Sequence, residues 1–299
     1  MELRQVEMFL EAADRRSITS AAQALYVAQP SVSAQIGALE RELGYPLFDR
    51  LPRGVRLTEV GRAVLPHARQ IMRQVAEIRD SIDALAGLQR GRLVLGTMPT
   101  VTAHLIPTVI KAFRDEYPAI DLRVVEASAS VVLEELAAHR LDVAVVTGAQ
   151  PGPQVDVAPL MTEELYAIVP VDDPLAAREE IDLRELQDRP FVVLESGFSL
   201  RNVLYEICSG AGFSPRIAQE MSSIQGIKGL VEIGMGVSLA PRMSVEQEER
   251  LGLLRALRLI QRPQRQLQIV TSRGSYLSRS AGEFIAICQR TAAGMPAQS

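Results

Sequence analysis

The sequence predicts a protein in two parts: an N-terminal all-α winged helix-turn-helix with a long linker helix, followed by a C-terminal α/β module of two lobes. Three observations predict this architecture. Residues 1–58 contain three short helical patterns and then a strand, a turn and a strand. Residues 59–90 form one long helical pattern, and from residue 91 short apolar runs alternate with helical patterns. We therefore expect segments at 1–58, 59–90 and 91–299.

The first 44 residues have the order of a helix-turn-helix. Apolar residues recur at helical spacing from Leu3 to Ala13, which predicts a first helix with one buried face. Ser17 is a suitable N-cap for a short second helix. A third helix begins at Gln29 and Pro30, because proline is tolerated in the first turn, and it ends at Gly44. A helix, a short helix, a turn and a third helix are the parts of this motif.

The next residues predict a two-stranded wing that carries positive charge. Two short strand patterns at 46–50 and 55–57 flank a turn at 52–54. The net charge of the chain is −4, but seven arginines stand against four acidic residues from Glu40 to Arg73. Because positive charge is concentrated in this part, we expect any nucleic-acid contact to lie there.

The long helical pattern that follows predicts a coiled-coil seam. Thr58 is a suitable cap for it. Its apolar positions alternate by four and three residues, as in a heptad repeat. These positions are Val64, Ala68, Ile71, Val75, Ile78, Ile82 and Leu85. We expect this helix to pair with a second copy of itself; the alternative is a long amphipathic helix that packs on a core.

The remainder predicts an α/β module. Apolar runs near residues 93–95, 122–125, 143–146, 191–194 and 236–239 alternate with helical patterns at 105–117 and 131–138. Such alternation predicts largely parallel sheets covered by helices. We expect the chain to cross between two lobes near Leu160 and Met161 and again near residues 263–267. The first lobe would hold residues 91–160 and 266–290, and the second lobe residues 161–265.

Composition excludes several classes of protein. Hydrophobic residues make up 47% and charged residues 23% of 299, which is typical of a folded globular chain. No apolar run is long enough to span a membrane and no signal peptide opens the sequence, so we expect a cytoplasmic protein without membrane contact. Cys208 and Cys288 stand alone, which predicts no disulfide and no metal site. No catalytic or phosphate-binding motif occurs, so neither an enzyme nor a cofactor is expected.

Several segments, in order and spacing, resemble the LysR-type transcriptional regulators over nearly the whole chain. They are residues 17–25 (SITSAAQAL), 29–33 (QPSVS), 39–44 (LERELG), 47–50 (LFDR), 57–61 (LTEVG) and 234–241 (GMGVSLAP). The resemblance implies a DNA-binding domain at 1–58, a dimerisation helix at 59–90 and an effector-binding domain at 91–299 that is similar to periplasmic solute-binding proteins. It also implies a dimer that assembles further into a tetramer.

The sequence departs from the family pattern in three places. Ala28 stands where a serine or threonine often caps the recognition helix. That helix has a small outward face, with Ser33, Ala34 and Gly37 where longer basic side chains are common. Residues 196–208 resemble the segment in which the peroxide-sensing branch forms a switch disulfide, but Ser199 replaces the first of its two cysteines. This departure argues against redox sensing.

We expect the DNA contacts on the start of the third helix and on the wing. Side chains there can enter the major groove, and Gln29 can make two hydrogen bonds to adenine. Wing arginines are placed for phosphates or a minor groove, although each could also be a solvated or paired surface charge. The candidates are Gln29, Pro30, Ser31, Ser33, Gln35, Arg50, Arg53 and Arg56.

We expect the effector site between the lobes, where strand ends meet helix starts and unpaired N–H groups attract anions. Each hydroxyl there could instead be a helix cap, but such residues recur at several junctions. The candidates are Thr100, Thr102, Ser128, Ser130, Thr147, Ser196, Phe198, Ser199 and Arg201. Arg201 is the one full charge among them, which favours a small anionic or polar metabolite.

The sequence thus predicts a regulator that binds duplex DNA at an interrupted, two-fold symmetric site and responds to a small-molecule effector. One alternative is a constitutive DNA-binding regulator whose sensor module has lost its ligand. The other is a transport-type solute-binding protein, which would need an export signal.

Overall fold

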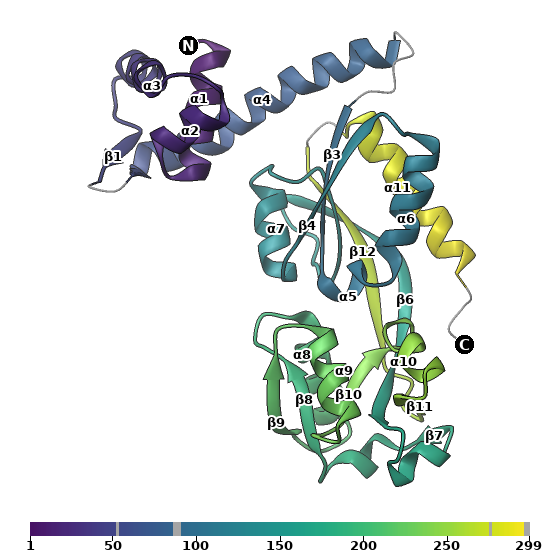
Figure 1. The fold of residues 1–299 in the computed structure, drawn as a ribbon. Coiled ribbons are helices and arrows are strands. Elements are labelled where there is room, and N and C mark those ends of the chain that lie inside the picture. Colours follow the sequence, from purple (N-terminus) through teal and green to yellow (C-terminus); the bar gives the residue numbers. More distant parts are fainter. Residues whose placement is uncertain (52–53, 86–90, 275–276, 296–299) are drawn as a thin grey trace. The chain divides into compact units, whose positions relative to one another are not determined.

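The computed structural model describes residues 1–51, 54–85, 91–274 and 277–295. They divide into two compact units, one built mainly from the N-terminal helices and one from the strands and helices after residue 90 (Figure 1). Wing residues 52–53, Arg53 among them, lie outside the described part. We describe each unit by itself.

The N-terminal unit has the predicted helices and wing. Its elements are α1 (Leu3–Arg15), α2 (Ile18–Ala24), α3 (Gln29–Leu43), β1 (Phe48–Arg50), β2 (Val55–Leu57) and α4 (Glu59–Leu85). Ser17 caps α2 by accepting a hydrogen bond from the Ser20 backbone N–H at 3.2 Å. Gly44 ends α3 in the left-handed conformation (φ 79°), which glycine adopts without steric cost. The core centres on Phe9, whose ring lies 5.4 Å from that of Phe48.

The wing is fixed to the helices by backbone groups. β1 and β2 pair antiparallel, with Asp49 opposite Arg56. The Glu40 carboxylate on α3 accepts hydrogen bonds from the backbone N–H groups of Leu47 and Phe48, at 2.7 and 3.2 Å. A Cβ on Gly61 would lie 2.1 Å from the Leu47 carbonyl oxygen, so the start of α4 approaches the wing as closely as glycine alone permits. These contacts position the wing beside the start of α4.

Helix α4 continues the N-terminal core before it extends away from it. Thr58 caps the helix by accepting a hydrogen bond from the Gly61 backbone N–H at 2.9 Å. Ala68 is buried in the N-terminal core and Val64 packs against the same core. The first two positions of the predicted seam therefore already have partners inside the chain. Of the later positions, Ile78 is 61% exposed; the side chains of Ile82 and Leu85 lie outside the described part.

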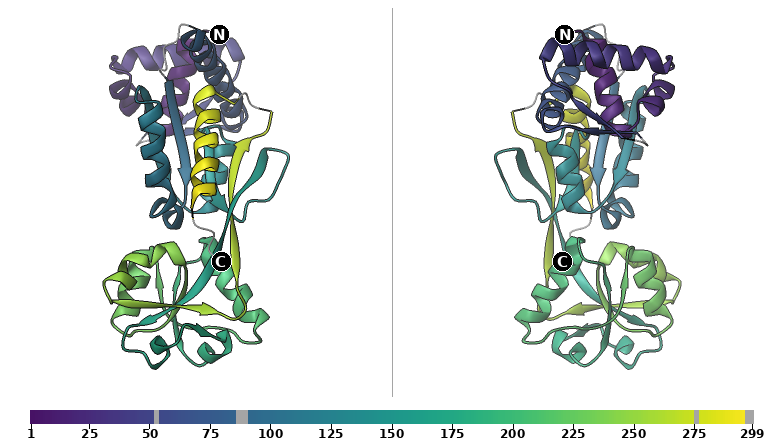
Figure 2. Two further views of the ribbon diagram at one scale, coloured as in Figure 1. Left: turned by 90° about the vertical axis from the view of Figure 1, so that its right-hand side faces the viewer. Right: turned by 90° about the vertical axis from the view of Figure 1, so that its left-hand side faces the viewer.

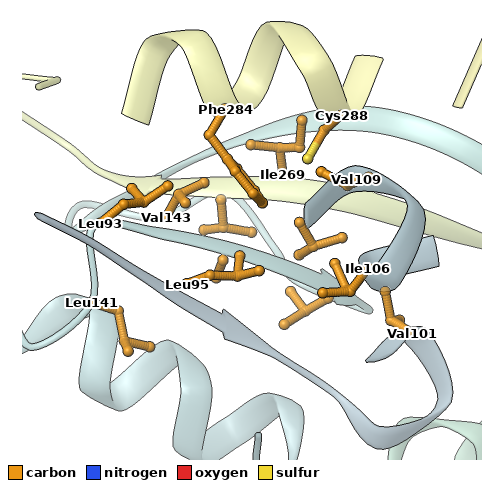
Figure 3. Packing of buried hydrophobic residues seen from close by; sticks show 14 of the residues in the cluster. Leu93, Leu95, Val101, Ile106, Val109, Leu141, Val143, Ile269, Phe284 and Cys288 are labelled. Carbon is orange, nitrogen blue, oxygen red and sulfur yellow. The ribbon is translucent and has the colours of Figure 1, made fainter. Parts of the chain in front are cut away.

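The first lobe of the C-terminal unit packs helices on both faces of a sheet. Its elements are β3 (Gly91–Thr97), α5 (Pro99–Thr102), α6 (Leu105–Glu116), β4 (Ile120–Glu126), α7 (Ala129–Ala137), β5 (Val143–Thr147) and the C-terminal α11 (Arg279–Gly294). Strands β4, β3 and β5 are parallel, as predicted. In the core, Phe284 and Cys288 of α11 lie over the same sheet as Leu95, beside Val109 of α6 (Figure 3).

Two long strands, which the sequence patterns did not reveal, connect the lobes. They are β6 (Val155–Pro170) and β12 (Gln264–Ser272). Residues 155–164 of β6 pair antiparallel with β12, and from Leu165 onward β6 pairs with strands of the second lobe. Figures 1 and 2 show both strands running from the first lobe into the second. The expectation of largely parallel sheets is therefore wrong for the strands that cross, because a strand that returns between lobes runs opposite to the one that left.

The second lobe has two small apolar cores around its strands. Its elements are β7 (Glu180–Ile181), β8 (Pro190–Leu194), α8 (Ser199–Gly210), β9 (Arg216–Met221), α9 (Ile224–Glu232), β10 (Ser238–Pro241), α10 (Glu246–Arg250) and β11 (Leu254–Leu259), with short 3-10 turns at Pro174–Ala177, Leu183–Leu186 and Arg242–Ser244. One core contains Phe191 and the buried Cys208, and the other contains Leu200 and Ile227. None of the helices described here is long and apolar enough to span a bilayer.

Candidate nucleic-acid interface and interlobe site

The N-terminal half of α3 has a polar side that faces away from the core. Gln29 and Pro30 are exposed, and Ser31, Ser33 and Gln35 are partly exposed. On the opposite side Val32, Ile36 and Leu39 are buried in the N-terminal core. The helix therefore presents the residues that the sequence analysis assigned to base contacts.

Two of these residues are bonded to each other. The Gln29 Nε2 group donates a hydrogen bond to Ser33 Oγ at 2.9 Å, one turn further along α3. A side-chain amide has two N–H donors and one carbonyl acceptor. Gln29 therefore keeps one donor and its acceptor for a base edge, which is the pair of groups that adenine requires in the major groove.

Tyr26 is an exposed aromatic residue that the sequence analysis did not single out. It lies in the turn between α2 and α3, has a left-handed backbone (φ 55°), and is 96% exposed. A non-glycine residue in this conformation is uncommon and costs conformational free energy. The turn thus exposes an aromatic ring three residues before Gln29, the first residue of α3.

Two wing arginines belong to the described residues. Arg50, at the end of β1, is exposed. Arg56 on β2 forms an ion pair with Asp49 at 3.2 Å, and both side chains are largely exposed. An exposed ion pair of this kind contributes little to stability, so its arginine can exchange the carboxylate for a phosphate. Both side chains are therefore accessible to a nucleic-acid backbone.

In the C-terminal unit, a hydrogen bond joins the two lobes. Thr147 at the end of β5 and Ser199 at the start of α8 place their hydroxyl oxygens 2.7 Å apart. Both hydroxyls lie near the Met98 sulfur, at 4.0 and 3.7 Å. A strand end of one lobe thus meets a helix start of the other, as the sequence analysis expected.

A buried arginine, Arg265, lies on β12, one of the two strands that connect the lobes. The Arg265 side chain is 2% exposed. Its Nε donates to Glu163 Oε2 at 2.6 Å, and its Nη1 donates to Thr100 Oγ1 at 3.1 Å. Its Nη2 is buried and has no hydrogen-bond partner among the residues described. Because an unsatisfied buried donor is costly, this atom requires an explanation.

The second lobe contributes another ion pair, between Lys228 and Glu248. Lys228 on α9 donates to Glu248 Oε1 at 2.6 Å and to the Ser244 carbonyl at 2.9 Å. His104, just before α6 of the first lobe, is close enough for these charges to act on it: burial, then the cations Lys228 and Arg265, lower its pKa to about 4, against an opposing effect of Glu248. Its imidazole is therefore neutral near pH 7.

The remaining predicted effector residues have local partners. Thr102 donates to the Met98 carbonyl at 3.0 Å, and the hydroxyls of Ser128 and Ser130 lie 3.1 Å apart. Ser196 is exposed, and Phe198 packs against a core of the second lobe.

Arg201, the one charged residue among the predicted effector contacts, has partners within its own lobe. It donates to the Leu194 carbonyl at 2.9 Å, pairs with Glu220 at 2.8 Å, and lies over the Tyr205 ring. Other charged residues, described above, therefore lie nearest the lobe junction.

Five charged or titratable residues at the junction were missed by sequence reasoning. They are His104, Glu163, Lys228, Glu248 and Arg265. Two of them lie on β6 and β12, which were not recognised as strands, and Lys228 lies on the buried side of α9 with Ile224, Ile227 and Val231. A lysine at helical spacing from apolar residues was the one signal in the sequence.

The cysteines are enclosed by apolar side chains. Cys208 and Cys288 are buried in different cores, and burial raises the pKa of Cys208 to about 11 and that of Cys288 to about 12. Both stay protonated near neutral pH, and a thiol is a poor nucleophile compared with its thiolate.

Family models match both units of the chain. A model described as a bacterial regulatory helix-turn-helix protein of the lysR family matches residues 3–62, and one described as the LysR substrate binding domain matches residues 86–293. The chain belongs to the LysR-type transcriptional regulators. This confirms the predicted fold class, a DNA-binding helix-turn-helix followed by a two-lobed effector-binding domain.

Relatives and solved structures agree with this assignment. The regulator is 33% identical to the transcriptional dual regulator GltC of Bacillus subtilis over 286 residues, 95% of each chain. It is 32% identical to the RuBisCO operon transcriptional regulator of Allochromatium vinosum, over 95% of this chain and 94% of that one. A full-length single-residue variant of OxyR from Pseudomonas aeruginosa has a similar structure, with a TM-score of 0.78, 25% identity, and coverage of 98% of this chain and 94% of that one.

Proposed function

We propose that this regulator binds an interrupted, two-fold symmetric DNA site and that a small polar or anionic metabolite, held between the lobes, changes this binding. The observation that carries the proposal is the buried polar junction of the C-terminal unit. There Thr147 and Ser199, from different lobes, share a hydrogen bond, and the buried Arg265, on a strand that connects the lobes, has an unsatisfied donor among the described residues. Polar groups gathered at a lobe junction are the usual means by which such a module recognises a small molecule.

The DNA-reading part of the proposal assigns different tasks to α3 and the wing. Gln29 reads a base edge, and Pro30, Ser31, Ser33 and Gln35 line the groove around it. Arg50 and Arg56 contact phosphates, which supply affinity without selecting sequence. The same task is assigned to Arg53, which lies outside the described residues.

The symmetry of the site requires at least a dimer. We assign residues 59–90 to dimerisation and place the contact on the part of α4 beyond the N-terminal core, from Ile71 and Val75 through Ile78 to Ile82 and Leu85. Ile78 is 61% exposed although it is apolar, as expected of a residue that a partner helix covers. A tetramer would bring together two such pairs. Residues 1–58 and 91–299 keep the tasks of DNA binding and effector binding.

Effector control follows if the ligand stabilises one arrangement of the lobes over another. A ligand can shift such an equilibrium only by the difference between its affinities for the two arrangements. The Thr147–Ser199 hydrogen bond joins the lobes in the arrangement seen here. A metabolite that replaces this hydrogen bond, or forms further hydrogen bonds with the two hydroxyls, would shift the equilibrium between the lobe arrangements.

A thermal-shift screen of small metabolites on the full-length protein tests effector binding. We expect at least one polar or anionic compound to raise the melting temperature of the wild type, and Thr147→Val or Arg265→Lys to reduce that shift. Thr108→Val, an exposed threonine on α6 of the first lobe, is the matched control. If no compound stabilises the wild type while the protein still binds DNA from its own upstream region, the constitutive alternative is correct.

A further inference from the structure

The interlobe junction contains one unsatisfied donor and one unsatisfied acceptor, each on a charged side chain. Arg265 Nη2 is a donor that cannot accept, and Glu248 Oε2 of an ionised carboxylate is an acceptor that cannot donate. Both atoms are buried, and neither has a partner within the part of the chain described here. The charges of Arg265, Lys228 and Glu248 all act on the pKa of His104, which lies just before α6 of the first lobe, and its Nε2 is also unpartnered among the described residues.

The charges of this junction already balance. Arg265 is paired with Glu163 at 2.6 Å, and Lys228 is paired with Glu248 at 2.6 Å. His104 adds no charge near neutral pH because burial and the neighbouring cations hold its pKa at about 4. A ligand with net charge would bring an uncompensated charge into a buried and neutral place, and this is costly. A ligand of zero net charge avoids that penalty.

The unsatisfied atoms define what such a ligand must present. Its acceptor must be strong enough to bond a guanidinium, and carboxylate oxygens are the groups that arginine binds best. Its donor must satisfy a carboxylate oxygen, for which an ammonium gives a charge-assisted bond. A molecule that carries both groups and is neutral overall is a zwitterion.

We propose that the interlobe site recognises the carboxylate and ammonium groups of a small α-amino acid, the carboxylate through Arg265 and the ammonium through Glu248. This inference rests on the proposed effector function and specifies the ligand class. The neutral imidazole of His104 contributes a further hydrogen bond between the two charged contacts. Thr147 and Ser199 lie at the same junction and contact the remainder of the ligand.

The first test compares matched probes on the full-length wild type by calorimetry and thermal shift. The probes are the twenty standard L-amino acids, their α-hydroxy acid analogues, which lack the ammonium, and their decarboxylated amines, which lack the carboxylate. We expect at least one amino acid to bind at least ten-fold more tightly than both of its analogues. If a hydroxy acid or an amine binds as tightly as the best amino acid, the inference is wrong, while effector binding itself stands.

The second test uses variants with matched controls. Arg265→Lys keeps a cation for Glu163 but loses Nη2, and Glu248→Gln removes the charge that would hold an ammonium. Arg258→Lys is the control for the first, because Arg258 is also paired with a buried glutamate, Glu164, at 2.8 Å. Glu249→Gln is the control for the second, because Glu249 is the next residue of α10 and is paired with Arg242 at 2.7 Å.

Both test variants should weaken binding of the selected amino acid at least ten-fold, and both controls should change it less than two-fold. A native-like near-ultraviolet circular dichroism spectrum and a cooperative melting transition without amino acid show that each variant is folded, and if Glu248→Gln does not fold, Arg265→Lys and the wild-type probe series still decide. Unchanged affinity in folded Arg265→Lys would overturn the inference. Loss of DNA binding by the wild type would contradict the proposed function instead.

Discussion

The two candidate sites of this regulator differ in the burial of their polar side chains. On α3 the polar side chains are exposed, come from adjacent turns of one helix, and bond to each other, as Gln29 and Ser33 do. At the lobe junction the polar side chains are buried and come from distant parts of the chain, as Glu163 and Arg265 do. Removing the partner of an exposed charged group costs little folding free energy, whereas removing the partner of a buried charge costs several kcal/mol, about 3–5. The difference predicts how each surface responds to change.

The largest loss of folding stability is expected when the buried ion pair between Arg265 and Glu163 is broken. Arg265→Leu leaves the Glu163 carboxylate, which is 3% exposed, without its cation. We expect a loss of about 3–5 kcal/mol in the free energy of unfolding. The exposed pair gives the contrast: Arg56→Ala, which removes the partner of Asp49, should cost less than about 1 kcal/mol. Urea denaturation of both full-length variants measures this, and equal losses would contradict the comparison.

The next effect concerns sequence reading on α3. Gln29→Ala should lower the preference for the natural operator over scrambled DNA by about 1–3 kcal/mol, because one base contact is lost. Arg50→Ala should weaken binding to both DNAs alike and reduce the slope of log affinity against log salt by about 1. Fluorescence anisotropy titrations at several salt concentrations separate the two. A sequence-dependent loss in Arg50→Ala would contradict the division of tasks.

A smaller effect is expected from Ser33, which holds the Gln29 amide. Ser33→Ala removes one hydrogen bond between exposed side chains, and the net value of such a bond is about 0.5–1.5 kcal/mol. The preference for the operator should therefore fall by less than in Gln29→Ala. In the Gln29→Ala background the Ser33→Ala change should add nothing, and a full additional loss there would show that Ser33 contacts DNA independently.

His104 gives the buried junction a pH dependence. Its pKa is lowered to about 4 in the folded chain, from 6.5 for an exposed histidine, chiefly by burial. The unfolded chain therefore binds more protons than the folded chain between these values, so His104 lowers stability progressively as the pH falls below 6.5. Wild-type melting temperature should decline more steeply than that of His104→Gln between pH 7 and pH 4.5. Parallel curves would contradict the assignment.

No effect is expected at the cysteines. Burial raises the pKa of Cys208 to about 11 and that of Cys288 to about 12, so few thiolates form below pH 9. The folded protein should resist iodoacetamide, and mild peroxide treatment should leave its DNA affinity unchanged. Mass spectrometry after urea treatment, when both thiols become accessible, is the positive control. Rapid labelling of the native protein would show that the cores open.

The same contrast explains how far the sequence could predict this molecule. Local signals sufficed where structure is local: Ser17, Gly44 and Thr58 cap the helices that were predicted to begin or end beside them. They failed for β6 and β12, because a strand that leaves one lobe for another changes its partner strands along its length. The junction residues on these strands could not be found without their pairing.

The predicted effector residues show the same limit. Thr100, Thr147 and Ser199 lie at the junction, because the rule that strand ends meet helix starts depends on topology alone. Arg201 follows the same rule, but Glu220 of the neighbouring strand β9 pairs with it. A sequence identifies a charged side chain but not the carboxylate that folding brings beside it.

We expect occupation of the interlobe junction to change the affinity for DNA. The most direct test measures the operator affinity of the full-length protein by anisotropy, with and without a saturating concentration of the compound that best stabilises the wild type. We expect the affinity to change by about 5–150-fold in the wild type, the usual range of such coupling, and by less than two-fold in folded Arg265→Lys. An operator affinity that is the same with and without the bound compound would show that the junction does not control DNA binding.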